Sequence, residues 1–108
     1  MQREIICPEW KPFERNTLRG FARIKVPSWH LTIYDVAVHE RDGKRWAQLP
    51  ARPMLDSNRE LIREDGKLKY ARMLEFDDRA IGDRFGAAAI KAIDDFIAAS
   101  KRVDEGAF

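Results

Sequence analysis

The strongest constraint on the fold is a change in hydrophobic period along the chain. In residues 17–26 apolar and polar side chains alternate, which is typical of a strand that buries one face. Further on, the apolar residues recur at steps of three and four, which predicts a helix with one apolar stripe. That stripe comprises Ile81, Phe85, Ala88, Ala89, Ala92, Ile93, Phe96 and Ile97. We therefore expect an α+β fold, in which a curved antiparallel sheet of four to five strands is followed by one C-terminal amphipathic helix.

Two consecutive strands are expected in residues 17–39. The first would bury Leu18, Gly20, Ala22, Ile24 and Val26 and point Thr17, Arg19, Phe21, Arg23 and Lys25 to the opposite face. In the second, simple alternation would put Leu31 and Ile33 on one face and Val36 and Val38 on the opposite face. A β-bulge near Tyr34-Asp35 would bring all four to the core side.

Two Asp-Gly pairs predict tight turns, because these residues accept the positive φ angles that such turns need. The first, in residues 41–44, leads into a third strand at residues 45–49. The second, in residues 64–67, falls within a polar stretch that forms either a long loop or a flexible hairpin, and we favour a polar mobile loop at residues 53–69. A further strand is expected at residues 70–76. Asp77 or Asp78 would then cap the helix, which is expected to end near Lys101-Arg102.

The two ends of the chain are expected to contribute little. Residues 1–14 would form an edge segment with a strand at residues 4–7, because Pro8 and Pro12 limit pairing, and residues 103–108 a frayed tail. With 108 residues, 44% of them apolar, the chain can build one core, so we expect a single domain spanning residues 1–108.

Cysteine content and hydropathy indicate the compartment. Cys7 is the sole cysteine, which excludes an intramolecular disulfide and favours a reducing, cytoplasmic environment. No apolar stretch is long enough for a signal peptide or a membrane span, so we expect a soluble protein that has no membrane partner.

Residues suited to catalysis are scarce. The two histidines, His30 and His39, stand beside no Ser or Cys in a nucleophile motif. Asp35 and His39, with the distant His30, lack the close ligand spacing of a zinc site. The six glycines form no phosphate-binding loop. We therefore expect no enzyme activity, no catalytic residue, no metal, no cofactor and no small-molecule substrate.

The most informative feature for function is a run of cations on the polar face of the first long strand. Residues 11–52 contain nine basic and four acidic side chains, although the whole chain carries a net charge of only +2. Cations neutralise phosphates and an exposed ring stacks on a base, so such a face suits single-stranded nucleic acid. The same alternation also describes an ordinary solvated sheet. The candidate nucleic-acid-binding residues are Arg15, Arg19, Phe21, Arg23, Lys25, Tyr34, Arg45, Trp46 and Arg52.

The order of these elements resembles that of the bacterial septation protein SpoVG family of small DNA- and RNA-binding regulators. The resemblance covers about Leu18 to Ile97 and is carried by Gly20-Phe21-Ala22-Arg23-Ile24, by Leu31-Thr32-Ile33-Tyr34-Asp35-Val36-Ala37-Val38 and by Trp46-Ala47-Gln48-Leu49-Pro50-Ala51-Arg52. It implies DNA or RNA binding with a regulatory role, with Arg52 of the Leu-Pro-x-Arg element as the best-supported contact, followed by Arg59, Arg63, Lys67 and Lys69. The architecture is also similar to that of positive-cofactor-four-type single-stranded DNA-binding coactivators. Small uncharacterised proteins of proteobacteria and their phages are similar in the Gly-Phe-Ala-Arg motif at residues 20–23 and the Trp-x-x-Leu-Pro-Ala-Arg-Pro motif at residues 46–53.

Two functions stay open on the sequence. The first is non-enzymatic binding of DNA or RNA, single-stranded or weakly sequence-specific, through the basic sheet face. The alternative is a homodimeric protein-interaction module with no nucleic-acid role, because Trp10, Phe13, Trp29 and Trp46 are more aromatic surface than a small monomer readily hides. A homodimer is compatible with either function.

Overall fold

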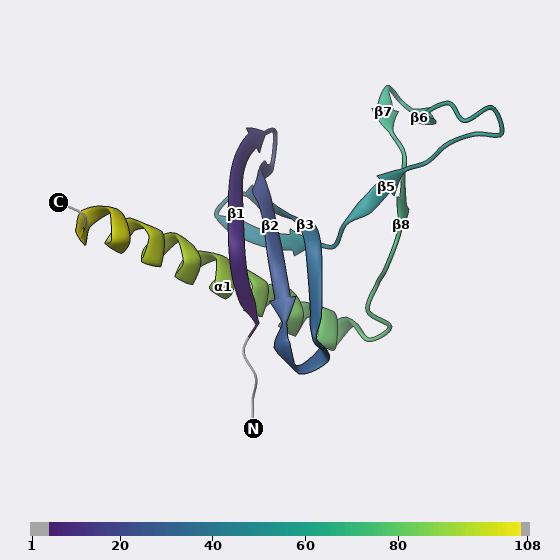
Figure 1. The fold of residues 1–108 in the computed structure, drawn as a ribbon. Coiled ribbons are helices and arrows are strands. Elements are labelled where there is room, and N and C mark those ends of the chain that lie inside the picture. The colour runs from purple at the N-terminus through teal and green to yellow at the C-terminus, as the bar shows by residue number, and fades with distance from the viewer. Residues whose placement is uncertain (1–4, 107–108) are drawn as a thin grey trace.

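The computed structural model describes residues 5–106, and for residues 102–106 the backbone alone (Figure 1). Four strands form one antiparallel sheet in the order β1-β2-β3-β4, with β1 at Ile6–Arg15, β2 at Leu18–Val26, β3 at Leu31–Arg41 and β4 at Lys44–Gln48. A 3-10 helix, η1, spans Pro27–Trp29 between β2 and β3, and the C-terminal helix α1 spans Arg79–Gly106. The expected α+β class, an antiparallel sheet followed by one helix, is confirmed.

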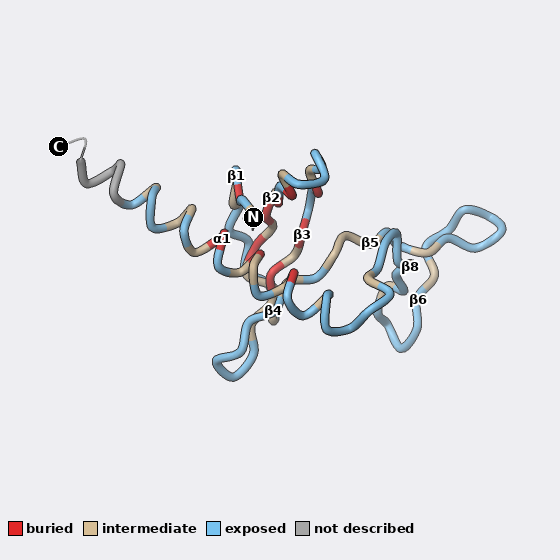
Figure 2. The backbone as a smooth tube through the Cα atoms, turned by 90° about the horizontal axis from the view of Figure 1, so that it is seen from below, coloured by how far each residue is buried: buried red, intermediate tan, exposed pale blue. Residues whose placement is uncertain are grey.

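The core lies between the sheet and α1, which crosses one face of the sheet (Figure 1). Its buried apolar residues are Cys7, Ala22, Ile24, Val26, Ile33, Val36 and Val38 of the sheet and Phe85, Ala89, Ala92 and Ile93 of the helix. Ile24 and Val36 are 0% exposed, and each contributes about 1.5–3 kcal/mol by burial. Figure 2 shows the buried segments on the sheet and the first half of α1. Of the predicted helical stripe, Ile81 departs from the pattern at 48% exposed.

The β-bulge expected at Tyr34-Asp35 is confirmed. The pairing of β2 with β3 shifts register between Ala22↔Val36 and Ile24↔Ile33, and Asp35 has a φ of 59°. The extra residue turns Ile33, Val36 and Val38 into the core together. Leu31 was also expected on the core side. It lies at the start of β3 and is 39% exposed, so it is only partly buried.

Strand β1 is longer than expected. It has 10 residues and runs through both prolines, whereas the sequence predicted a strand at residues 4–7, of which residue 4 lies outside the described chain. Pro8 falls within a register shift between Ile6 and Glu9, and Pro12 pairs with Gly20. Both are tolerated because β1 is an edge strand, where a missing N–H can face away from the ladder.

A glycine is required at position 20, where β1 pairs closely with β2. A Cβ at this position would lie 2.5 Å from the Trp10 ring and 2.5 Å from the carbonyl oxygen of Lys11. The indole of Trp10 therefore packs directly on the backbone of β2, and it is partly buried against the core.

Residues 51–72 fold into a two-stranded hairpin, here called the hairpin arm, which projects from the sheet (Figure 1). In it, β5 (Ala51–Pro53) pairs with β8 (Tyr70–Arg72), and β6 (Arg63–Glu64) pairs with β7 (Lys67–Leu68). Asp65 and Gly66 have φ of 53° and 78°, as a tight hairpin turn requires. The polar stretch is thus a hairpin and not a long loop, and its mobility stays a prediction. The strand expected at residues 70–76 stops at Arg72.

Helix α1 begins where the sequence predicts. The Oδ1 atom of Asp78 accepts a hydrogen bond from the N–H of Ile81 at 3.2 Å, so Asp78, rather than Asp77, caps the helix. The helix continues to Gly106, beyond the end expected near Lys101-Arg102. Of the tail expected to fray, residues 107–108 lie outside the described chain. Among residues 5–106, no helix combines the length and the apolar character needed to cross a membrane.

Candidate nucleic-acid interface

The sheet face turned away from α1 has no helix over it and is here called the open face. Strand pairing defines its members, because residues opposite each other across a ladder share a face. By pairing they are Glu9 and Lys11 of β1, Leu18, Phe21, Arg23 and Lys25 of β2, Thr32, Ala37, His39 and Arg41 of β3, and Lys44, Trp46 and Gln48 of β4. Contacts with these residues add Phe13 and Tyr34, and Asp35 lines the same groove as Tyr34. The open face therefore mixes aromatic rings with charged side chains.

Three ring contacts run across the open face. The Phe13 and Phe21 rings lie 6.3 Å apart between centroids. The guanidinium carbon of Arg23 lies 4.8 Å from the centroid of Tyr34. His39 stacks on Trp46 at 5.5 Å with 12° between the ring planes. Phe13, Tyr34 and Trp46 are 52%, 59% and 43% exposed, so each ring still presents surface to a ligand.

Arg23 is held by neighbours on two strands. One of its terminal nitrogens lies 3.2 Å from Oε1 of Glu9, the residue opposite it on β1, and its guanidinium covers Tyr34. Its Nε atom is buried and has no hydrogen-bond partner among the described residues. Glu9 therefore offsets part of the positive charge at the centre of the open face.

Five of the predicted site residues come together on the open face: Phe21, Arg23, Lys25, Tyr34 and Trp46. Arg19 departs from this group because a register shift falls between Leu18 and Gly20. Its guanidinium donates to the carbonyl oxygens of Asn16 and Leu18 at 2.8 and 3.1 Å. Arg15 ends β1 opposite Leu18, so both cations lie at the β1–β2 turn, at one end of the face.

Arg45 lies on the helix side of the sheet, apart from the open face. It donates two hydrogen bonds to the Asp94 carboxylate of α1, at 2.8 and 2.9 Å. The hydrogen bond to Asp94 raises the pKa of Arg45, and the same bond lowers the pKa of Asp94 below its ordinary value. Arg45 thus ties β4 to α1, a partnership between residues 49 positions apart that no local sequence pattern shows.

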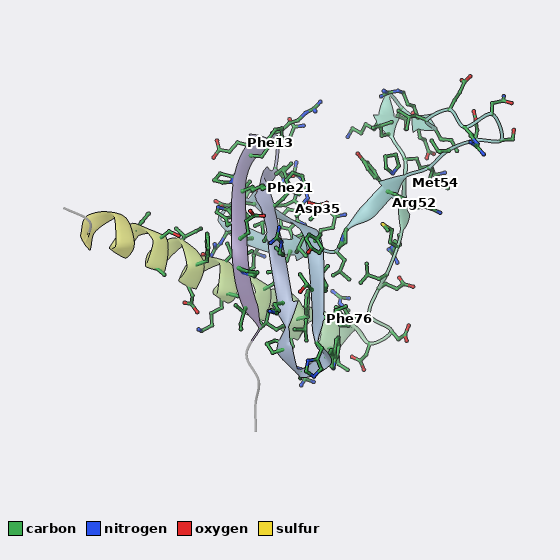
Figure 3. The ribbon with its side chains drawn as sticks, viewed as in Figure 1. Phe13, Phe21, Asp35, Arg52, Met54 and Phe76 are labelled. Carbon is green, nitrogen blue, oxygen red and sulfur yellow. The ribbon has the colours of Figure 1, made fainter. Side chains whose placement is uncertain are left out.

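Arg52 is likewise separate, because it lies on β5 in the hairpin arm, where it pairs with Ala71 (Figure 3). Of the other arm cations, Lys69 forms an ion pair with Glu64 at 3.5 Å. Arg59, Arg63 and Lys67 form no ion pair within the described part of the chain. The contact that the resemblance favours most therefore does not belong to the cluster on the sheet.

A groove of about 940 Å³ separates the open face from the base of the hairpin arm. Phe21, Tyr34 and His39 line it from the sheet, and Tyr70, Met73 and Leu74 from the arm side. The last three were not among the predicted site residues, because nothing in the local sequence shows that the arm returns past β3. Phe13 was not among them either, because β1 was expected to end before it.

Two further observations concern metal ligands and the thiol. The described residues contain no group of three or more His, Cys, Asp or Glu side chains able to hold a metal ion. Burial raises the pKa of the Cys7 thiol, so it stays protonated at neutral pH and is a weak nucleophile.

Comparison with known proteins adds no relative. No protein-family model, curated protein or solved structure matches the chain. The function is therefore inferred from the side chains of the open face and its groove.

Proposed function

We propose that the protein is a non-enzymatic nucleic-acid-binding protein and that its open face binds single-stranded DNA or RNA with weak sequence specificity. The observation that carries this is that exposed rings share one uncovered sheet face with cations: Phe13 lies beside Phe21, Trp46 stacks on His39, and the Arg23 guanidinium covers Tyr34. The resemblance to SpoVG-like regulators supports the same function, in the cytoplasm, which the single cysteine also favours.

The physical basis is the chemistry of an unpaired strand. Unstacked bases present flat π surfaces, and each base that stacks on an aromatic side chain contributes about 1–3 kcal/mol. Lys11, Lys25 and the cations at the β1–β2 turn supply charge for the phosphates, and each phosphate contact releases a counterion. A duplex hides its bases, so the open face would favour the single strand.

The test is fluorescence anisotropy with single-stranded and duplex oligonucleotides over a salt series. We expect the single strand to bind more tightly, with log affinity falling by about 0.7 per phosphate contact against log salt. Tyr34→Ala and Phe13→Ala are each expected to weaken binding about tenfold. Trp29→Ala is the matched control, because Trp29 is 61% exposed on η1 yet lies outside the open face. Absence of binding at low salt, or equal losses in all three variants, would refute the proposal.

Glu9→Gln adds a variant to the same experiment that is expected to bind more tightly. Removing this carboxylate frees its two ion-pair partners, Arg23 and Lys11, for phosphates and removes a negative charge that repels them, so we expect the affinity to rise severalfold. Glu14→Gln on the same strand makes the same charge change at an exposed residue outside the open face. If both substitutions act alike, overall charge and not Arg23 governs the binding.

A homodimeric protein-interaction module is the second candidate. The observation that favours it is the apolar rim of the groove, where Leu31, Met73 and Leu74 are 39%, 62% and 41% exposed. Light scattering over a concentration series measures the mass directly. A dimer that dissociates when Met73 becomes Asp, together with no affinity for any oligonucleotide, would establish this function in place of the first.

A further inference from the structure

Cations and apolar side chains occupy different parts of the open face. Lys11, Arg23 and Lys25 lie on β1 and β2, Arg15 and Arg19 at the turn between these strands, and Arg41 and Lys44 at the β3–β4 turn. The groove lies between β3 and the hairpin arm, and none of the described residues that line it is a Lys or an Arg. A single strand has the same division, with phosphates along one side and bases along the other.

Among the described residues that line the groove, Asp35 is the one Asp or Glu. It belongs to the β-bulge of β3, has a φ of 59° and lines the same groove as its neighbour Tyr34. Figure 3 labels it beside β3. Its carboxylate makes no hydrogen bond or ion pair with any described residue. An unpaired carboxylate repels phosphates and accepts hydrogen bonds, so the backbone of a strand is disfavoured here and an N–H donor is favoured.

We infer that the bases of the bound strand enter the groove while its phosphates follow β1 and β2, and that Asp35 accepts a hydrogen bond from the exocyclic amino group of a base. This inference rests on the proposed function and adds a base preference to it. Cytosine, adenine and guanine carry an exocyclic amino group, whereas uracil and thymine present only carbonyl oxygens and a ring N–H. Bases that carry an amino group are therefore selected over uracil and thymine.

The groove has the size and the lining that this requires. Its volume of about 940 Å³ lies at the upper end of the range of about 300–1,000 Å³ typical of ligand sites. Phe21, Tyr34 and Tyr70 supply ring surface, and the amide of Gln48 can both donate to and accept from a base edge. Uracil in the same position would turn its O4 atom toward the Asp35 carboxylate, and the two acceptors would repel each other.

The experiment compares deoxycytidine and deoxyuridine homopolymers of equal length, whose bases differ by one amino group against one carbonyl oxygen. At neutral pH and fixed salt we expect the full chain to bind the cytidine strand about tenfold more tightly. Asp35→Asn is expected to bring the two affinities within about twofold of each other, because an amide both donates and accepts. Asn also tolerates positive φ, so the bulge is preserved.

Asp42→Asn is the matched control. Asp42 has a φ of 52° in the β3–β4 turn and does not line the groove, so this variant makes the same charge change on a similar backbone. We expect it to keep the tenfold preference. Salt-dependent binding with equal affinity for both homopolymers would overturn the groove inference and leave the proposed function standing. No binding of either homopolymer would overturn both, and a doubled mass by light scattering would then assign the groove to a second copy of the chain.

Discussion

At the scale of single residues, Gly20 shows how closely β1 and β2 approach. The Trp10 ring and the Lys11 carbonyl oxygen both occupy the space that a methyl group at this position would need. We expect Gly20→Ala to lower the free energy of unfolding by about 1–3 kcal/mol, because the ring and the strand have to move apart. Urea denaturation monitored by the fluorescence of Trp10, Trp29 and Trp46 measures the change.

Gly86 provides the opposite case within the same chain. It lies in α1 with nothing within 4 Å of the position of a Cβ. Gly86→Ala is therefore expected to raise the free energy of unfolding by about 0.5–1 kcal/mol through helix propensity. Equal effects of the two substitutions would contradict the close packing of Trp10 on β2.

Residues whose environment follows from local alternation were predictable from the sequence. Phe21, Arg23 and Lys25 share a face because they are two positions apart in one strand, and Tyr34 joins them because the phase change in β3 signals a bulge. The side of Arg45 follows from alternation as well, because Arg45 and Trp46 are neighbours in β4 and point to opposite faces. Its partner Asp94, which comes from an element far along the chain, was not predictable, and neither was the position of Arg52 in the hairpin arm.

At the scale of secondary-structure elements, predictability depends on how much of an element is buried. The core strands β2 and β3 and the helix α1 have clear periods because one face of each is covered. Most residues of the hairpin arm are exposed on both faces, so its sequence is polar without a period and suggests a loop. Strand β1 was predicted too short for a different reason, because Pro8 and Pro12 suggest an early end although an edge strand tolerates both.

The link between β4 and α1 predicts a pH dependence of stability. The hydrogen bond from Arg45 lowers the pKa of Asp94 in the folded state below its unfolded value of about 3.9. This group therefore stabilises the fold above that unfolded pKa, and the contribution disappears as the pH falls through the lower folded pKa. The side chains are 39% and 45% exposed, so we expect a contribution of at most about 1 kcal/mol.

Asp94→Asn tests this link. The variant is expected to be less stable than the parent chain at neutral pH. The difference is expected to shrink as the pH falls below the unfolded pKa of Asp94 and to vanish once Asp94 is protonated in the folded state as well. Asp95→Asn, which removes an equal charge from an ion pair with Lys91 within the helix, is the control and is expected to cost less. Thermal unfolding across a pH series measures both. A difference that persists unchanged in acid would show that the Arg45 contact is not its source.

At the scale of the whole molecule, the buried core and the hairpin arm are distinct parts. Every residue of the core cluster belongs to β1, β2, β3 or α1, and no buried residue lies in the arm (Figure 2). The arm meets the rest of the described chain through its base, where Ala51 and Tyr70 line the groove. We therefore expect that the length of the arm can be changed with little effect on the free energy of unfolding.

Shortening the arm checks this separation. The N–H of Met54 donates to the carbonyl oxygen of Lys69 at 2.8 Å, so residues 55–68 can be replaced by Asn-Gly as a tight two-residue turn. The replaced segment holds three basic and four acidic side chains, which leaves the charge nearly unchanged. We expect Tm to shift by at most a few degrees, and oligonucleotide affinity to change less than about threefold, by calorimetry and anisotropy. A tenfold loss of affinity would show that the oligonucleotide binds the tip of the arm and not the open face.

The two prolines of β1 bear on what happens when copies of the chain meet. An incoming strand that aligned with the free side of β1 would find carbonyl groups but too few N–H groups to complete a ladder, because Pro8 and Pro12 supply none. This side is therefore a poor template for sheet growth. Association of two sheets through β1 is therefore disfavoured even in a concentrated solution, although the protein displays a face rich in exposed rings.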